Sequence, residues 1–399
     1  MSMSAQITPG ELMPVLDPLS EADPWATYAT CRKHSPVSAG EDGAWFLFRY
    51  TDVRHALTDS SYGVEMPFRA SRRAFGPSML DTDGVVHERL RQVVQPPFRT
   101  RIRSESVPQL IASIARGLLE DECMHSDVVD LAATFAFRLP VRVFCSIMGI
   151  PEEDAEWWYT VLRPIIGCID QTGATMADVA AQRRSVARYF SEKAHVDGYD
   201  RAGLLAHITG AFEDDEDLTE VSLFSNALML MAAGTETTGL ALANLLAALL
   251  RSPEHEELLR GDPKWIAPVV QESLRLDPPL HMIMRVTAAD EIVRDVLIPA
   301  GSVVHLCLAS ANRDEEYFEE PDVWRLDRRS PPALTFARGK HACLGSALAL
   351  LELEVALRTL HEETTAIHFV GEEVPQPSGR AFRGVRHLPV VLERRGSRP

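Results

Sequence analysis

The feature that most limits how this chain can fold is a long apolar segment, Val221 to Leu250. Its run of Leu, Ala and Met is interrupted by Asn226, Glu236 and Asn244. A membrane-spanning helix needs about 20 nearly charge-free residues, and a carboxylate near its middle is costly. The segment therefore predicts a long helix through the core of a soluble protein.

Composition agrees with a soluble protein that has a large core. Of 399 residues, 46% are apolar and 24% are charged. The net charge of −17 repels polyphosphate, so binding of nucleic acid or of an anionic membrane surface is disfavoured. Met1 to Glu11 has no basic n-region and no apolar run, so neither a secretory signal nor a membrane anchor is expected there. The six cysteines show no CxxC spacing. A reducing cytoplasm is the expected compartment.

Patterning along the chain predicts a mainly α protein with a minor β part and no parallel βαβ unit. No repeat and no Gly/Ser linker divides the chain, so a single domain over residues 1–399 is expected. The individual elements predicted are a strand at 45–49, a helix from an N-cap at Thr51 to Leu57, a helix at 87–94 stopped by Pro96 and Pro97, a helix at 265–276, a hairpin turning at Pro299–Gly301, and a helix from Cys343 to Leu360.

The most informative stretch for function is Phe336 to Gly345, which reads FARGKHACLG. Cys343 lies at the start of a predicted helix, where backbone N–H groups and the helix dipole favour a thiolate. Gly339 and Gly345 let the backbone approach a large planar ligand. Taken alone, the cysteine is also compatible with a small buried side chain, with a zinc site that has only His341 nearby, or with a cysteine hydrolase.

The complete pattern F-x-x-G-x-H-x-C-x-G resembles the haem-binding loop of the cytochrome P-450 family. Two positions depart from the usual family sequence. Ala337 stands where the family usually has glycine, which predicts a less permissive turn. The usual arginine of the following helix is absent from Leu348-Ala-Leu-Leu-Glu352, which weakens a peripheral contact.

Further segments resemble the same family in the expected order. Ala233-Gly-Thr-Glu-Thr-Thr238 is similar to the oxygen-binding part of the family's central helix, and Thr237 is placed to bond back to the carbonyl of Ala233. Glu272 and Arg275 match the family's E-x-x-R pair, which we expect to be buried and structural.

Cations that suit the two haem propionates occur at four places. His87 and Arg91 are four residues apart on one predicted helix and resemble the family's H-x-x-x-R clamp. Arg285 matches the arginine before the predicted hairpin, and His341 belongs to the cysteine loop. Each of these side chains, considered singly, could equally be a solvated surface cation.

The resemblance implies a cytochrome P-450 fold with haem b between the long central helix and the cysteine-loop helix. Cys343 would be the iron ligand, with Phe336, Gly339 and Gly345 shaping its loop and Ala233 and Gly234 leaving space for O2. Glu236 and Thr237 would deliver protons to the oxygen. Electrons would come from NAD(P)H through a ferredoxin reductase and a ferredoxin, since no flavin or iron–sulfur motif is seen. Arg89, Arg99, Arg101, Arg103, Arg338 and Lys340 are candidate docking cations, and scattered solvated arginines are the alternative.

The implied activity is monooxygenation, by hydroxylation or epoxidation, of a moderately sized and largely apolar molecule in natural-product biosynthesis. Family position assigns the pocket to residues 60–82, 162–175, 280–284, Met229, Ala233 and Ala381-Phe382, with His281 either contacting a polar group of the substrate or facing the surface. Alternatives are a haem-binding sensor or carrier without turnover, a family member that performs oxidative ring coupling, and a metal-free cysteine hydrolase.

Overall fold

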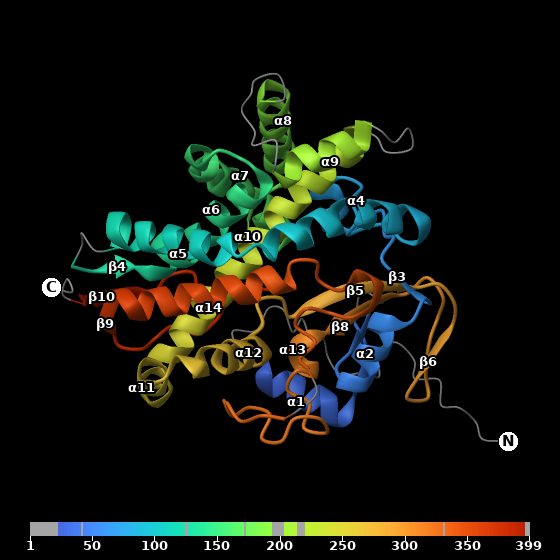
Figure 1. Ribbon diagram of the computed structural model, residues 1–399. Coiled ribbons are helices and arrows are strands. Elements are labelled where there is room, and N and C mark those ends of the chain that lie inside the picture. The colour runs from blue at the N-terminus through green and yellow to red at the C-terminus, as the bar shows by residue number, and fades with distance from the viewer. Residues whose placement is uncertain are drawn as a thin grey trace. The chain divides into compact units, whose positions relative to one another are not determined.

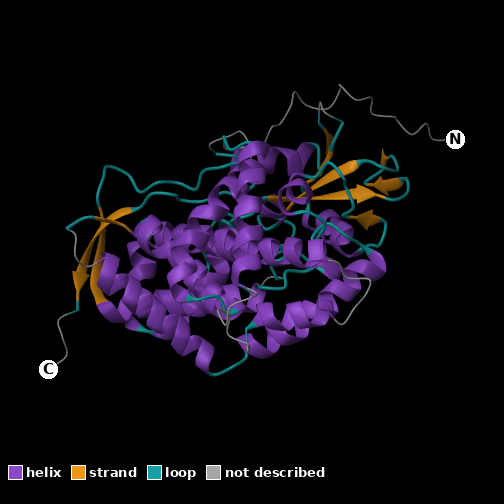
Figure 2. Cartoon of the chain, turned by 90° about the horizontal axis from the view of Figure 1, so that it is seen from above, coloured by secondary structure: helices purple, strands orange, loops and turns teal. Residues whose placement is uncertain are grey.

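The computed structural model describes residues 23–40, 43–123, 127–170, 173–193, 203–213, 220–329 and 332–395 (Figure 1). Met1 to Glu11, for which no targeting signal was predicted, lies outside these residues. Helix predominates and strands are a minor part, as the sequence predicts (Figure 2). The chain forms two compact units, each built from stretches that are distant in sequence. The prediction of one domain stays a prediction.

The first unit comprises the described parts of 1–66, 272–343 and 378–383 and contains the larger sheet. The strand order is β1-β2-β8-β5-β3, and only the β2–β8 pair is parallel among these five described strands. Leu47, Val53, Leu306 and Phe318 belong to its apolar core. Its elements are α1 (Trp25–His34), β1 (Val37–Ala39), β2 (Trp45–Leu47), α2 (Tyr50–Thr58), β3 (Tyr62–Gly63), β5 (Met282–Thr287), β6 (Glu291–Val293), β7 (Val296–Ile298), β8 (Val303–Cys307), α13 (Leu308–Ala311) and the 3₁₀ turn η5 (Gly339–His341).

The start of α2 differs from the prediction that Thr51 caps it. Thr51 lies inside the helix, and its hydroxyl bonds to the Tyr317 hydroxyl at 2.6 Å. The cap comes from Asp314, which is fully buried and distant in sequence. Its Oδ2 accepts the N–H of Tyr50 at 2.8 Å, and its Oδ1 accepts from Arg49 Nη1 at 2.6 Å.

The predicted hairpin turn at Pro299–Gly301 was also wrong. The tight turn joins β6 to β7 at Arg294 and Asp295, which both have positive φ, 49° and 65°. Two successive left-handed residues match the twist of a two-residue hairpin. Pro299–Gly301 instead leads from this hairpin to β8, which pairs with β2 and β5.

A buried ion pair fixes the end of α12 (Ile266–Leu276), whose residues from Glu272 on belong to the first unit. Arg275 donates to both carboxylate oxygens of Glu272, at 2.7 and 2.8 Å, and both side chains are about 95% covered or more. Arg328 Nε adds a third bond at 2.9 Å. Burial alone would raise the pKa of Glu272, but the hydrogen bonds and charge of Arg275 bring this pKa below its ordinary value. The prediction of a buried structural pair is confirmed.

The second unit comprises the described parts of 67–271, 344–377 and 384–399 and is mainly helical. Its sheet is antiparallel, in the order β4-β10-β9. Its elements are α3 (Ala70–Phe75), α4 (Gly84–Ile102), α5 (Ser106–Leu118), the π-turn η1 (Leu119–Cys123), β4 (Val129–Asp130), the π-turn η2 (Ala132–Ala136), α6 (Arg138–Met148), the 3₁₀ turn η3 (Glu152–Asp154), α7 (Ala155–Ile169), α8 (Met176–Lys193), α9 (Leu204–Glu213), α10 (Glu220–Leu250), α11 (Pro253–Gly261), the 3₁₀ turn η4 (Pro263–Trp265), α14 (Ser346–Glu363), β9 (Thr364–Phe369) and β10 (Pro389–Arg394).

The long apolar segment forms α10, an unbroken helix (Figure 1). Residues 223–250 are long and apolar enough to cross a membrane, but 72% of the most apolar window is buried within the protein. Such burial is typical of a core helix in a folded protein. The prediction of a long core helix therefore agrees with the structure.

Helix α4 continues through Pro96 and Pro97, so the prediction that these prolines end it was wrong. Each proline lacks an N–H and removes one bond of the helix, but its φ is compatible with helical geometry. Val94 and Phe98, one turn apart, are fully buried, and the Thr100 hydroxyl donates to the carbonyl of Pro96 at 3.0 Å. Burial of this face carries the helix to Ile102.

Candidate functional site

The cysteine loop belongs to the first unit as far as Cys343 and is closed by its own backbone. The N–H of Cys343 donates to the carbonyl of Phe336 at 2.9 Å, and the N–H of Ala342 donates to Gly339 at 3.0 Å. Cys343 is exposed, whereas the other five cysteines are buried or half-buried. The fold therefore presents one thiol, just ahead of α14 in sequence.

Positive φ angles define the turn of this loop. Gly339 has φ of +74°, and a Cβ there would overlap the carbonyl oxygen of Leu57 at the end of α2. Ala337 has φ of +54°, a left-handed conformation that costs an L-residue about 1–2 kcal/mol. The less permissive turn predicted for Ala337 is confirmed. Gly345 has an ordinary φ of −86°, and a Cβ there would meet no described atom within 4 Å.

Two of the predicted propionate cations lie in the first unit. Arg285 is on β5, 4% exposed, and its Nη1 donates to the carbonyl of Met284 at 2.9 Å. His341 is half-buried in η5. A guanidinium in this position is compatible with binding an anion, because charge-assisted hydrogen bonds from arginine suit carboxylates. The propionate role itself stays a prediction.

In the second unit, α10 has an uncovered patch in an otherwise buried stretch. Ala233 is exposed and Gly234 and Thr237 are half-buried, although Met231 and Ala232 next to them are buried. Position 234 can hold only glycine without a shift of its neighbours, because a Cβ there would lie 2.5 Å from the Phe144 ring. The patch thus combines small residues with one hydroxyl.

Thr237 makes the predicted back-bond. Its Oγ1 donates to the carbonyl of Ala233 at 2.9 Å, and Thr238 does the same to Gly234 at 3.1 Å. With its hydrogen used in this way, the Thr237 oxygen keeps lone pairs that can accept from a water molecule.

Glu236, predicted to relay protons from solvent, lies beside Thr237 and is 13% exposed. Its Oε1 accepts from Arg386 Nη1 at 3.0 Å, and the Arg386 side chain is 38% exposed. Sequence reasoning missed Arg386, because nothing in the local pattern FRGVRHLP relates it to a residue 150 positions earlier. Glu236 therefore forms an ion pair with Arg386.

His87 and Arg91 share one face of α4, as their spacing predicts. His87 is 2% exposed and Arg91 is half-buried. Arg91 Nε reaches Gln95 Oε1 at 3.4 Å. Both side chains are thus held against the protein rather than dispersed in solvent, which fits a clamp for carboxylates, although the propionate partner stays a prediction.

His281 belongs to neither the substrate wall nor the surface. It is 1% exposed, and its Nδ1 bonds to the Tyr28 hydroxyl at 3.2 Å. Burial, with the charges of Arg383 and Arg313, lowers the pKa of His281 well below its usual value, so the ring is neutral. It is a core residue of the first unit.

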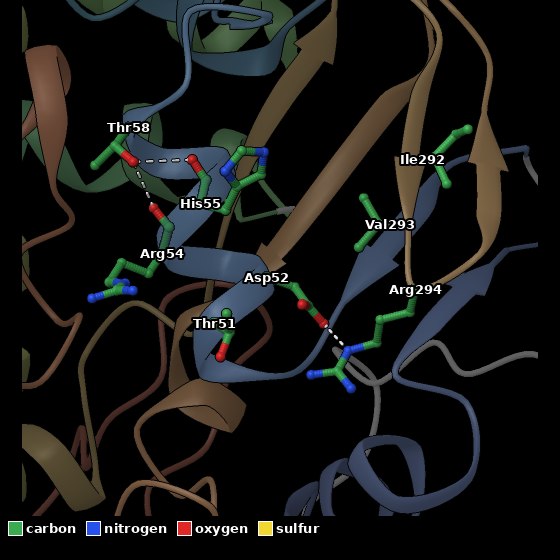
Figure 3. Close-up of a pocket in the computed structure, with 8 residues that line it drawn as sticks. All are labelled: Thr51, Asp52, Arg54, His55, Thr58, Ile292, Val293 and Arg294. Carbon is green, nitrogen blue, oxygen red and sulfur yellow. Dashed lines mark hydrogen bonds and ion pairs between the residues drawn. The ribbon is translucent and has the colours of Figure 1, made fainter.

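A groove of 510 Å³ opens between α2 and the β6–β7 hairpin (Figure 3). Arg294 Nε donates to Asp52 Oδ2 across it at 2.6 Å, and Arg54 and His55 lie on its α2 side. Six of its eight lining residues are polar or charged, unlike the apolar substrate pocket expected from the sequence.

Arg54, on α2, also affects a nearby tyrosine. Burial raises the pKa of Tyr50, and the charges of Arg338 and Arg54 oppose that rise. The two guanidinium groups therefore gather near one tyrosine.

Comparison with known proteins gives consistent matches. A family model described as Cytochrome P450 matches residues 265–363. The vitamin D(3) 25-hydroxylase of Pseudonocardia autotrophica is 34% identical over 393 residues, covering 93% of this chain and 94% of the relative. The tirandamycin C-bound P450 monooxygenase TamI has a TM-score of 0.83 at 30% identity, covering 95% of this chain and all of that one (100%). The enzyme CxnD, for C–S bond formation in chuangxinmycin biosynthesis, has a TM-score of 0.84 at 27% identity, covering 94% and 96%.

Proposed function

The chain belongs to the cytochrome P450 family and is a monooxygenase, and from this we propose that it inserts one oxygen atom of O2 into a moderately sized, largely apolar natural product. The family implies haem-thiolate iron and an electron-donating partner. Haem b, a ferredoxin with its NAD(P)H-dependent reductase, and a cytoplasmic location are part of the proposal. Relatives named for tirandamycin C and chuangxinmycin support the choice of substrate class.

The residues present suit a haem. An exposed thiol stands in a glycine-containing turn, and an uncovered stretch of α10 presents Ala233, Gly234 and the Thr237 hydroxyl, with the partly buried Glu236 beside them. When bound, a thiolate-ligated haem activates O2 for insertion into organic substrates. Cys343 would hold the iron, Ala233 and Gly234 would leave room for O2, and the remaining contacts would come from Phe336, Gly339 and Gly345 in the loop and from the propionate cations His87, Arg91, Arg285 and His341.

Proton supply is the role we assign to two residues of α10. Glu236 takes a proton from solvent and passes it to a water molecule that donates to the Thr237 hydroxyl oxygen. The back-bond of Thr237 to Ala233 fixes the direction of that oxygen. Thr237→Ala should divert O2 to peroxide, and an unchanged yield of product per NAD(P)H would contradict this role.

The apolar character of the substrate follows from the residues at the family's pocket positions. Met229 and Leu162 are apolar and nearly buried, and Leu280 and Met284 are apolar and half-buried. Phe382 is held by a backbone bridge to Leu280, which fixes the C-terminal loop of the first unit. Of the predicted pocket segments, residues 171–172 lie outside the described chain. Hydroxylation or epoxidation is proposed first, and oxidative coupling is kept second because CxnD forms a C–S bond.

A reduced carbon-monoxide difference spectrum tests the haem-thiolate assignment. The purified protein should show the strongly red-shifted Soret band of thiolate-ligated haem, and Cys343→Ser should abolish that band. Cys168→Ser is the matched control, because Cys168 is half-buried, contacts Met176, and has no assigned role. A red-shifted band that survives Cys343→Ser would overturn the assignment. A colourless protein would favour the alternative of a metal-free cysteine hydrolase.

Turnover separates the monooxygenase from a sensor or carrier. A compound selected by its low-to-high spin shift should be oxidised when NADPH, ferredoxin and ferredoxin reductase are added. A holoenzyme that binds such compounds and consumes NADPH without oxidising any of them would favour the carrier.

A further inference from the structure

We propose that Arg386 is a positioning residue that holds Glu236 and marks the place where protons enter from solvent; this rests on the proton-supply role of Glu236 in the proposed function. All residues involved lie in the second unit. The observation that carries it is the 3.0 Å ion pair between Arg386 Nη1 and Glu236 Oε1.

The segment around Arg386 is fastened to one face of α10. Glu236, Leu240 and Asn244 are spaced by four residues and therefore share that face. A Cβ on Gly384 would overlap the Leu240 side chain, and the N–H of Val385 donates to Asn244 Oδ1 at 3.0 Å. The backbone of residues 384 and 385 thus contacts α10 at two of the three positions, and the side chain of Arg386 reaches the third.

The other side of Arg386 is fixed as well. The N–H of Leu388 donates to Asp130 Oδ1 at 2.9 Å, and His387 Nδ1 bonds to Asp130 Oδ2 at 2.9 Å. Arg386 is therefore flanked on both sides by anchored residues. Its guanidinium reaches Glu236 from a backbone that has little freedom, so the ion pair defines where the carboxylate lies.

The two side chains of the ion pair differ in solvent exposure, and this difference indicates the path that protons take from solvent. The Arg386 side chain is 38% exposed and the Glu236 side chain 13% exposed, so the pair runs from solvent to the edge of the uncovered patch of α10. A guanidinium does not give up its own proton near neutral pH. Arg386 therefore orders the carboxylate and the water around it. The proton passes from solvent water to Glu236 and from there to the water at Thr237, which leaves the net charge of the pair unchanged after each transfer cycle.

The test uses the holoenzyme with NADPH, a plant-type ferredoxin in excess and its reductase, in air and without added substrate. Under these conditions O2 is reduced to peroxide or water, which consumes protons. Arg386→Met should slow NADPH oxidation about fivefold, because the carboxylate of Glu236 loses the charge-assisted hydrogen bond that positions it, and should raise the solvent isotope effect in D2O. Arg386→Lys keeps the charge and should return the rate to within about twofold of the parent protein.

Two controls separate proton supply from other effects. The rate of haem reduction, trapped with carbon monoxide, should be the same in Arg386→Met and the parent protein, because electron transfer is not involved. Arg395→Met removes an exposed charge just after β10 and should change neither the rate nor the isotope effect.

Glu236→Gln distinguishes failure of this inference from failure of the proposed function. If Glu236→Gln slows NADPH oxidation and Arg386→Met does not, Arg386 has no positioning role and the function of Glu236 stands. If neither variant changes the rate, the role of Glu236 is wrong and the inference falls with it. The Arg386→Met/Glu236→Gln double variant should be no slower than Glu236→Gln alone, and additive losses would overturn the coupling.

Thermal unfolding gives a readout that is independent of turnover. The two single substitutions should lower the midpoint by more in sum than the double substitution does, since each leaves the other charge unpaired. Coupling in stability combined with an unchanged isotope effect would show a purely structural ion pair, contrary to the proposal.

Discussion

At the scale of single residues, the cysteine loop depends on glycine at one position more than at the others. Gly339 combines a left-handed φ with a position at which a Cβ would overlap the carbonyl oxygen of Leu57, whereas Gly345 has neither constraint. The sequence pattern contains both glycines and does not distinguish them. Of the two glycines in this loop, only Gly339 is required by the backbone geometry of the described residues.

Gly339→Ala should therefore destabilise the holoenzyme by about 2–4 kcal/mol and lower its haem content, because strain and overlap with Leu57 act together. Gly345→Ala is the matched control and should stay within about 0.5 kcal/mol of the parent protein. Chemical unfolding and the haem-to-protein absorbance ratio measure both effects. Equal losses in the two variants would show that haem contact, and not backbone geometry, selects these glycines.

Residue roles could be predicted from the sequence where the partners are close along the chain. Glu272 with Arg275, and Thr237 with Ala233, are three and four residues apart on a helix, and both contacts occur as predicted. Arg386 could not be predicted, because its partner is remote in sequence. The wrong alternatives offered for His281 have the same cause, since the Tyr28 hydroxyl that satisfies its ring lies 253 positions away.

At the scale of elements, the sequence located the helices better than their ends. Helix α10 and helix α14 lie where apolar patterning places them, although α14 begins at Ser346, three residues after Cys343. Local rules misplaced the cap of α2 and the end of α4, because Asp314 and the buried face of Val94 and Phe98 decide those ends through tertiary contacts.

Helix α14 carries a carboxyl group whose titration should affect stability. Glu352 is 1% exposed, its Oε2 has no hydrogen-bond partner among the described residues, and burial raises its pKa well above the ordinary value. A raised pKa in the folded state means that the unfolded chain ionises first. The contribution of Glu352 to stability is therefore complete below the unfolded pKa of about 4.5 and is lost as pH rises toward the folded pKa.

Glu352→Gln should consequently raise the unfolding midpoint relative to the parent protein at pH 7.5 and have little effect near pH 4.5. Gln is the suitable replacement because it mimics the protonated carboxyl in size. Glu362→Gln, near the exposed end of the same helix, is the control and should show no such pH dependence. A Glu352→Gln variant that is less stable at pH 7.5 would show that Glu352 is ionised and paired in the holoenzyme.

At the scale of the whole molecule, the order of motifs along the chain was sufficient to predict the family and the mainly helical fold. The division into two compact units was not predictable, because each unit is assembled from separate stretches and no linker marks a boundary. The proposed docking surface was predictable only in part. Arg338 and Lys340 were found from the loop sequence, but Arg54 is added only by its place on α2 near Tyr50. Arg101, by contrast, already donates to the carbonyl of Ser146 at 3.0 Å.

For the acidic ferredoxin that we propose as electron donor, the overall charge of −17 predicts that these few cations govern docking. Long-range repulsion opposes the approach of an acidic partner, so productive encounter requires a local positive patch that acts within about 10 Å at 0.1 M salt. Arg338→Glu or Arg54→Glu should lower the ferredoxin-dependent reduction rate about tenfold at low salt, through KM more than kcat, and the difference should shrink as salt is added. Arg395→Glu imposes the same change of net charge on a residue of the second unit, so it measures the contribution of overall charge alone. If all three variants lose rate equally, net charge governs encounter and the patch of Arg54, Arg338 and Lys340 has no docking role.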